Sequence, residues 1–313
     1  MVLLADRGAA LEKAWEYGWA QTISGTAAGG DDDAGNRLAQ PFRKLWQTWK
    51  GDVPLPALFL NGTRVELGKR IITSNLPIIS TYLGEFADAE DAEEKLGRNS
   101  GRDIRLSTAA LMSARFTYVS PAGLLPEDGG HVVDGGYFEN SGAATALEVL
   151  YEVEAAIDHE KWPEPVVPIV IEIRNGPTQQ QPDTRKKEPV DAPKDAAPNS
   201  KKSGNGDHKT KPGFLGEVRA PIDTLAHTRE ARGTFSQEAI EGEQEFWADE
   251  HPDLKVQNRL LFGLHDSNVP LPLGWMLSGG AASEMRNQLH TNDDNQENAS
   301  AVMNQLLGTR PAP

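Results

Sequence analysis

One short stretch of the sequence places a carboxylate between an apolar segment and a pair of glycines. Residues 131–142 read HVVDGGYFENSG, so two valines lead into Asp134, and Gly135 and Gly136 follow. Glycines allow positive φ and leave space beside the carboxylate, so another group can approach it closely. Asp-Gly-Gly is also ordinary turn chemistry, and so short a motif discriminates poorly. Asp134 is therefore either a turn residue or half of a catalytic site.

The elements around Asp134 predict an α/β fold. HVVDGG reads as a short strand that ends at Asp134, and residues 141–157 follow the helical period. Residues 165–176, PVVPIVIEIRNG, form a β-branched run typical of a strand buried on both faces. Strand, helix and strand make a βαβ unit, which predicts a mostly parallel sheet covered by helices. In such sheets functional groups gather at the carboxyl ends of strands, where Asp134 is expected.

The upstream segments predict further elements of the same domain. Residues 5–20 and 39–50 have apolar residues at helical spacing, and residues 56–75 read as two short strands. Asn61-Gly62 either forms a tight hairpin turn or closes the first strand in a looser loop. The alanine-rich segment 106–116 predicts a short helix with Ser107 as its N-cap.

Composition excludes several classes of function. The net charge of −15 argues against nucleic acid as a partner and disfavours adhesion to anionic lipid. The absence of cysteine excludes disulfides, thiol catalysis and cysteine-based zinc sites, and it fits a reducing compartment. Because neither a signal peptide nor a membrane span is recognisable, a soluble chain is expected, in the cytoplasm or at the cytoplasmic face of a membrane.

The chain is expected to divide into four blocks. Residues 1–175 carry the Asp-bearing part of an α/β domain. Residues 176–212 contain no aromatic residue and are dense in Pro, Lys, Asp and Ser, which predicts a disordered insertion. Residues 213–290 return to globular composition as the C-terminal part of the same domain. Residues 291–313 predict a polar tail that frays after a last short helix.

The extended context of Asp134 resembles the patatin-like phospholipase family. The resemblance covers LSTAALMSARFTYVSPAG and HVVDGGYFENSGAATALEVL, whose spacing matches the family's Asp-Gly-Gly region. Upstream, LFLNGTRVELGKRIITSN is similar to the family's strand–Thr–x–x–x–x–Gly–strand segment, with Thr63 and Gly68 at the matching places. DRGAALEKAWE and VPLPLGWMLS look like a bacterial branch of the family. The resemblance extends over residues 1–175, is weaker over 213–290 and is absent from the insertion.

The resemblance implies a lipid acyl hydrolase with a Ser–Asp dyad, in which Asp134 is the general base and Gly135 and Gly136 shape its loop. A serine hydroxyl needs an adjacent base, and the tetrahedral oxyanion needs preorganised N–H donors. Neither the G-x-S-x-G serine nor a glycine-rich oxyanion loop occurs in this sequence: Ser24, Ser141 and Ser278 all lack the required spacing. The chain is therefore expected to be a fragment, incomplete at its N-terminus and inactive alone.

Other candidate residues are weighed against structural roles. Arg115 and Asn140 flank the site; Asn140 either caps its helix, which we favour, or orients a substrate ester. His131 and His227 are expected at structural or surface positions. The acidic runs at 31–33 and 87–95 lack the spacing of a calcium loop, so solvated acidic surface is expected.

The sequence thus supports two functions of different classes. The first is the Asp-bearing part of a lipid acyl hydrolase, without cofactor or metal, which acts on a lipid or acyl-ester substrate. It would be completed by an N-terminal segment and could associate with membranes through segments outside this sequence. The second is a non-catalytic lipid-binding or regulatory remnant of the same fold. An unrelated α/β protein with a chance Asp-Gly-Gly is the third reading.

Overall fold

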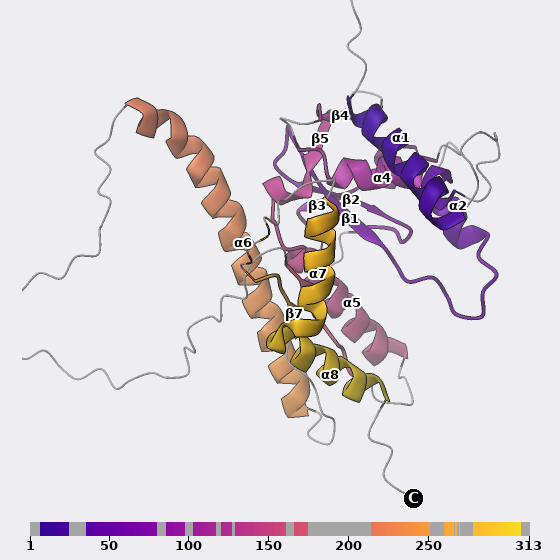
Figure 1. The fold of residues 1–313 in the computed structure, drawn as a ribbon, viewed down its shortest axis with the longest axis vertical. Coiled ribbons are helices and arrows are strands. Elements are labelled where there is room, and N and C mark those ends of the chain that lie inside the picture. The colour runs from indigo at the N-terminus through magenta and orange to yellow at the C-terminus, as the bar shows by residue number, and fades with distance from the viewer. Residues whose placement is uncertain are drawn as a thin grey trace, which may run out of the picture. The chain divides into compact units, whose positions relative to one another are not determined.

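The computed structural model describes most of the chain outside residues 175–213 (Figure 1). The described residues are 7–24, 36–79, 86–97, 103–116, 120–126, 129–160, 166–174, 214–250, 260–265, 267, 269 and 278–307. The predicted insertion at 176–212 lies outside them. Two compact units are found, Met1–Val166 with Asp223–Ile240, and Val167–Ile222 with Glu241–Pro313. These boundaries do not follow the blocks expected from composition.

The first unit is a five-stranded sheet with helices. Its strands are β1 (Phe59–Arg64), β2 (Arg70–Ser74), β3 (Ala89–Asp91), β4 (Gly123–Leu124) and β5 (His131–Asp134). Its helices are α1 (Arg7–Trp19), α2 (Phe42–Gln47), α3 (Ala92–Lys95), α4 (Leu106–Ser113) and α5 (Ala143–Glu160), with short turns of helix at Ala20–Ser24, Arg37–Ala39 and Gly135–Tyr137. The predicted helix–strand alternation is therefore confirmed as mixed α/β.

The sheet is mixed, and the prediction of a mostly parallel sheet is wrong. Its order is β3-β2-β1-β5-β4. Only β2 and β3 pair in parallel, whereas β1–β2, β1–β5 and β4–β5 are antiparallel. The expected βαβ unit fails because the strand after α5 does not join this sheet: it pairs with another strand in the second unit.

Helices cover the sheet on both faces, as predicted. Successive residues of a strand point to opposite faces, and all of β2 is buried. Ile71 packs with Met112 of α4 in one apolar cluster. Ile72 belongs to a second cluster, against which Val149 of α5 packs. One strand therefore supplies both cores of the unit.

Two local predictions for this unit are wrong. Asn61 and Gly62 lie inside β1 instead of forming the turn; the chain reverses over residues 65–69, where Gly68 has φ +63°. Ser107 does not cap α4, because the cap position is Arg105. Ser107 is fully buried and donates from Oγ to Glu16 Oε1 of α1 at 2.6 Å.

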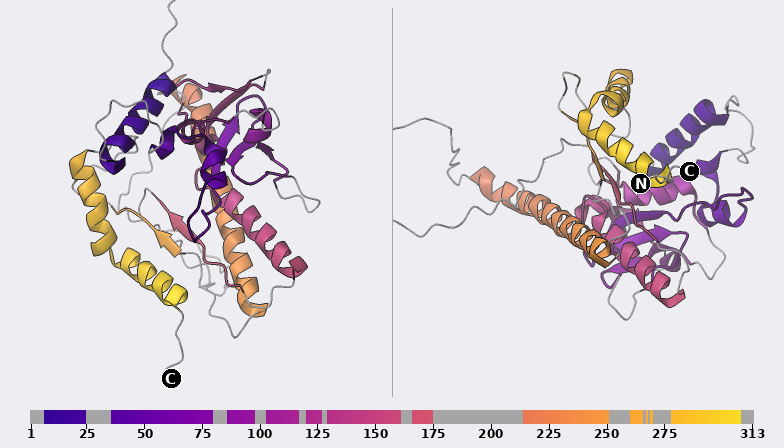
Figure 2. Two further views of the ribbon diagram at one scale, coloured as in Figure 1. Left: turned by 90° about the vertical axis from the view of Figure 1, so that its right-hand side faces the viewer. Right: turned by 90° about the horizontal axis from the view of Figure 1, so that it is seen from below.

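The second unit contains β6 (Ile171–Ile173), β7 (Leu260–Phe262), α7 (Gly279–Thr291) and α8 (Asp293–Leu307). Helix α6 (Phe214–Glu250) contributes to both units. β6 and β7 form a parallel pair next to α8 (Figure 2). Ile173 is 82% exposed, so β6 is not the doubly buried strand predicted. Most of the predicted tail is the helix α8.

Within the described residues, none of the helices combines the length and the apolar character needed to cross a membrane.

Candidate functional site

Asp134 is the last residue of β5, as predicted, and three hydrogen bonds fix its position. Its backbone N–H donates to the carbonyl of Arg115 at 3.0 Å. Its own carbonyl accepts from the Thr63 hydroxyl at 2.9 Å. Its side-chain Oδ1 accepts from the Gly136 N–H at 2.7 Å, so Asp134 caps the short helical turn that follows. The residue is neither fully buried nor fully exposed.

The two glycines after Asp134 are required by close contacts. A Cβ at Gly135 would lie 2.3 Å from the backbone oxygen of Asn61. A Cβ at Gly136 would lie 3.0 Å from Asp134 Oδ1 and 2.8 Å from Asn140 Oδ1. Any side chain at Gly135 would push the loop away from β1, and one at Gly136 would crowd the carboxylate. The predicted loop-shaping role is therefore consistent with the geometry.

Arg115 supports the site through its backbone. Its guanidinium Nη1 donates to the Pro121 carbonyl at 2.9 Å, and its side chain packs beside Gly123 of β4. The residue is 7% exposed. The guanidinium is thus engaged in local structure, and the contact that matters to Asp134 comes from the Arg115 carbonyl.

Asn140 lies beside Asp134, whereas neighbouring residues cap α5. The Ala143 N–H donates to Ser141 Oγ at 3.1 Å, and the Ala144 N–H donates to Glu139 Oε2 at 3.4 Å. The residues that cap α5 are therefore Glu139 and Ser141, and not Asn140 as we favoured. The exposed Asn140 keeps its amide oxygen over Gly136, next to the candidate carboxylate.

Two residues of β1 hold the loop, and sequence reasoning did not assign either of them this role. Thr63 binds the carbonyl of Asp134, and its Oγ1 also lies 3.4 Å from that of Gly135. The Asn61 backbone lies close to Gly135, and the Asn61 Oδ1 accepts from Thr145 Oγ1 of α5 at 2.9 Å. Their i, i+2 spacing places both side chains on the same face of β1, a signal that only a correct strand assignment would have revealed.

A buried cation links this loop region to the rest of the sheet. Arg70 is 2% exposed, and its guanidinium binds Asp88, Glu148 at 2.6 Å and the hydroxyl of Thr145 at 2.9 Å. Burial acts against the charged form, but hydrogen bonds and charge from Glu148 and Asp88 outweigh it, so the pKa of Arg70 is raised.

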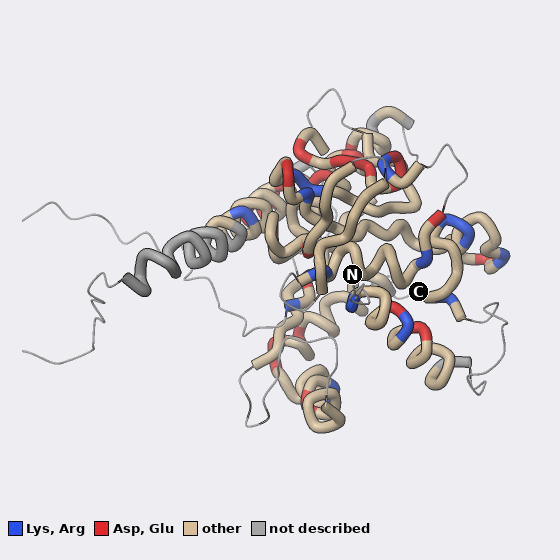
Figure 3. Tube along the Cα trace, turned by 90° about the horizontal axis from the view of Figure 1, so that it is seen from above, with Lys and Arg blue, Asp and Glu red and all other residues tan. Residues whose placement is uncertain are grey.

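Figure 3 shows acidic and basic residues interspersed along the chain.

The acidic run 87–95 was expected to be solvated surface; Asp88 and Glu94 are exposed, but the expectation is wrong for Asp91 and Glu93, which are buried. Glu93 is 1% exposed and pairs with Arg43 at 3.0 Å. Asp91 accepts from the Glu93 and Glu94 N–H groups at the start of α3. Arg43 of α2 is the cation that the buried Glu93 carboxylate needs, a partner that composition alone does not reveal. Residues 31–33 lie outside the described residues.

His131 stands apart from the candidate site. His131 is at the opposite end of β5 from Asp134 and is half exposed, as predicted, with Nδ1 2.8 Å from Glu66 Oε1. The pKa of Glu66 is lowered to about 2. The largest cause is the hydrogen bond from the His131 backbone N–H, and the next is the hydrogen bond from the His131 side chain. His227 lies in α6, and its side chain is outside the described part of the chain.

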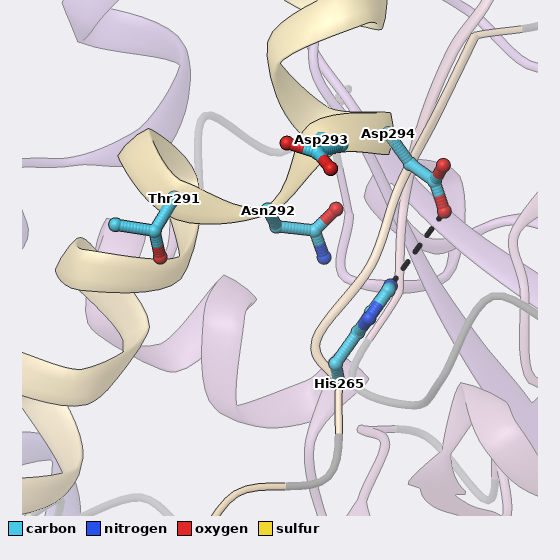
Figure 4. A pocket seen from close by; sticks show the side chains of 5 residues that line it. All are labelled: His265, Thr291, Asn292, Asp293 and Asp294. Atoms are coloured by element: carbon cyan, nitrogen blue, oxygen red, sulfur yellow. Dashed lines mark ion pairs between the residues drawn. The ribbon is translucent and has the colours of Figure 1, made fainter.

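A surface hollow in the second unit is unrelated to the predicted residues. It is lined by His265, Thr291, Asn292, Asp293 and Asp294 (Figure 4). His265 Nε2 and Asp294 Oδ2 are 3.7 Å apart, and both side chains are nearly half exposed. An exposed pair at this separation contributes little energy. The described residues contain no group of three or more acidic or histidine side chains that could hold a metal ion.

Comparison with protein-family models, curated proteins and solved structures finds no match to this chain.

Proposed function

We propose that this chain carries the general base of a lipid acyl hydrolase similar to the patatin-like phospholipases, with Asp134 as the acid member of a Ser–Asp dyad. The observation that carries the proposal is the Asp-Gly-Gly motif in its extended context, with Asp134 at the end of a strand. Two hydrogen bonds of the Asp134 backbone support it, one donated to the Arg115 carbonyl and one accepted from the Thr63 hydroxyl, because a base must be held in place. The fold would then be a patatin-like domain, incomplete at its N-terminus.

In this proposal Asp134 handles the protons of acyl transfer. As the serine oxygen attacks the ester carbonyl, Asp134 takes the hydroxyl proton and then returns it to the departing alcohol. Asp134 next takes a proton from water as it attacks the seryl ester, and it returns that proton to the departing serine oxygen as the fatty acid is released. The serine and the N–H donors for the oxyanion come from a segment outside this sequence. The substrate is a lipid or other acyl ester, in the cytoplasm or at the cytoplasmic face of a membrane.

The alternative is a non-catalytic lipid-binding or regulatory protein. Two observations favour it: G-x-S-x-G is absent from the sequence, and Asp134 Oδ1 makes the contact expected of a turn-forming aspartate. In that case Asp134 stabilises its loop, and lipid is bound without turnover.

Replacement of Asp134 by asparagine separates the two functions. The chain is co-expressed with the segment encoded immediately upstream, and hydrolysis of a p-nitrophenyl ester and of phosphatidylcholine vesicles is measured. D134N keeps an oxygen that accepts from Gly136 but removes the base, so activity should fall by about 10²–10⁴-fold. The matched control is D52N, the same change at an exposed loop position, which should leave the rate unchanged.

Full activity in D134N would refute the general-base role. The alternative predicts a different pattern: no hydrolysis by either protein, and equal flotation of wild type and D134N with phosphatidylcholine vesicles.

A further inference from the structure

The direction of the Asp134 carboxylate depends on the peptide plane that follows it. Asp134 has φ −46° and ψ 137°. The angle ψ decides where the next peptide lies, and hence whether the Gly136 N–H can reach Oδ1 at the observed 2.7 Å. That hydrogen bond fixes the rotamer of the carboxylate. Whatever holds the Asp134 carbonyl therefore also orients the side chain.

The Thr63 hydroxyl is the group that holds this carbonyl. Thr63 is 7% exposed, and its Oγ1 donates to the Asp134 oxygen at 2.9 Å, with the Gly135 oxygen at 3.4 Å. A hydroxyl has one proton to donate in a hydrogen bond. Here Thr63 donates it to the backbone carbonyl of Asp134, the residue proposed as the base. In the register of the sheet, Thr63 faces Val133, one residue before Asp134.

Asn61 closes the other end of the same loop. Its backbone oxygen lies 2.3 Å from where a Cβ at Gly135 would be, and its side chain accepts from Thr145 in the first turn of α5. Thr145 in turn accepts from the buried Arg70. Two residues on one face of β1 thus anchor the chain before and after the loop, so a change at Thr63 acts on a segment fixed at its far end.

We propose that Thr63 is a positioning residue for the Asp134 carboxylate. Its hydroxyl sets the peptide plane after Asp134, and through the Gly136 N–H it sets the orientation of Oδ1. The catalytic meaning of this arrangement rests on the proposed function, whereas the positioning itself does not.

The test compares Thr63→Val, which removes the hydroxyl and keeps the volume, with Thr63→Ser, which restores it. Amide hydrogen exchange of Gly136 and the ¹³C shift of the Asp134 carboxyl are measured by NMR on the full chain. T63V should accelerate Gly136 exchange by about tenfold or more, equivalent to about 1.4 kcal/mol for the hydrogen bond, and should move the carboxyl resonance. T63S should resemble the wild type.

The control is Thr73→Val, the same change at a buried position of β2, a strand that does not pair with β5. T73V should leave both signals unchanged. Thr63→Ala replaces T63V if the valine is not accommodated. The proposal would be overturned if the variant without the hydroxyl kept the wild-type Gly136 exchange rate and carboxyl shift. It would also be overturned if T63S changed both signals as T63V does.

An activity measurement separates this inference from the proposed function. In the co-expressed enzyme, T63V should lower kcat by about tenfold or more while KM stays within about twofold, because the base is misplaced but the substrate is still bound. If D134N retains full activity, the general-base role falls, and the NMR comparison still decides whether Thr63 positions the carboxylate.

Discussion

Asp134 shows how a residue can be identified by its sequence and yet be held by partners far away in the chain. A close neighbour supplies the Gly136 N–H to its side chain, whereas Thr63 and Arg115 bind its backbone. The position of Asp134 therefore depends on β1 and on the segment after α4, and mutations there should displace Asp134.

Gly135 should be the least tolerant residue of the loop. In Gly135→Ala the new methyl group meets the Asn61 oxygen at 2.3 Å, and because that oxygen is backbone it cannot move aside. We expect a loss of about 1–3 kcal/mol in the free energy of unfolding, measured with urea. Gly18→Ala in α1 is the control, because nothing lies within 4 Å; it should stabilise by about 0.5–1 kcal/mol. Equal effects of the two changes would refute this reading.

Glu66 should make stability depend on pH in the acid range. Its pKa in the folded chain is lowered from 4.5 to about 2, first by the His131 backbone N–H and then by its side chain. A lowered folded pKa adds stability that is complete above about pH 4.5 and is lost as pH falls toward 2. An NMR titration should place the Glu66 midpoint near 2.

Glu66→Gln tests the same linkage independently. The difference in unfolding free energy between wild type and E66Q should shrink steadily as pH falls from 4.5 to 2. A difference that is constant over this range would contradict the assignment.

At the scale of elements, β1 organises the first unit. It pairs with β2 on one side and with β5 on the other; its Thr63 binds the end of β5, and its Asn61 binds the first turn of α5. Both neighbours of β1 run antiparallel to it, and the sheet is mixed because β2 pairs in parallel with β3 on its other side.

Arg70 should be essential to the packing of α5 on the sheet. In Arg70→Met, Glu148 of α5 keeps its partly buried charge but loses this cation, so we expect a loss of about 3–5 kcal/mol in unfolding free energy. The double variant R70M/E148M removes both charges and should recover a large part of that loss. Urea unfolding of wild type, both single variants and the double variant gives the coupling directly. Additive effects would mean that the pair is not coupled.

At the scale of the whole molecule, the first unit is completed by a segment distant in sequence. Residues 223–240 of α6 belong to it; Ile240 is 2% exposed, and the guanidinium of Arg232 lies 4.3 Å from the ring centroid of Phe138. A Cβ at Gly233 would lie 3.0 Å from Glu139 Oε1, so α6 approaches the loop after Asp134 closely.

A chain that ends at residue 166 should therefore lack a cooperative fold. It exposes the surface that residues 223–240 cover, so we expect a loss of near-UV circular dichroism and binding of a hydrophobic dye. The control is the full chain under the same conditions. A sharp unfolding transition with an unchanged midpoint in the shorter chain would show that this part of α6 is dispensable.

The sequence by itself determined the types of most elements and the position of Asp134 at the end of a strand. Periods of 3.6 and 2 are local properties, so α1, α5, β2 and β5 could be predicted from short windows. The Asp-Gly-Gly motif could be found in the same way, because all its residues are contiguous.

Only the tertiary structure decided the partners of those elements. A strand carries no local mark of its neighbour or direction, so β5 was expected beside the strand after α5 but pairs with β1. The roles of Thr63, Asn61 and Arg70 follow from that pairing and from the face on which each side chain lies. These contacts join residues 71 to 84 positions apart, where register and burial, and not local propensity, determine the outcome.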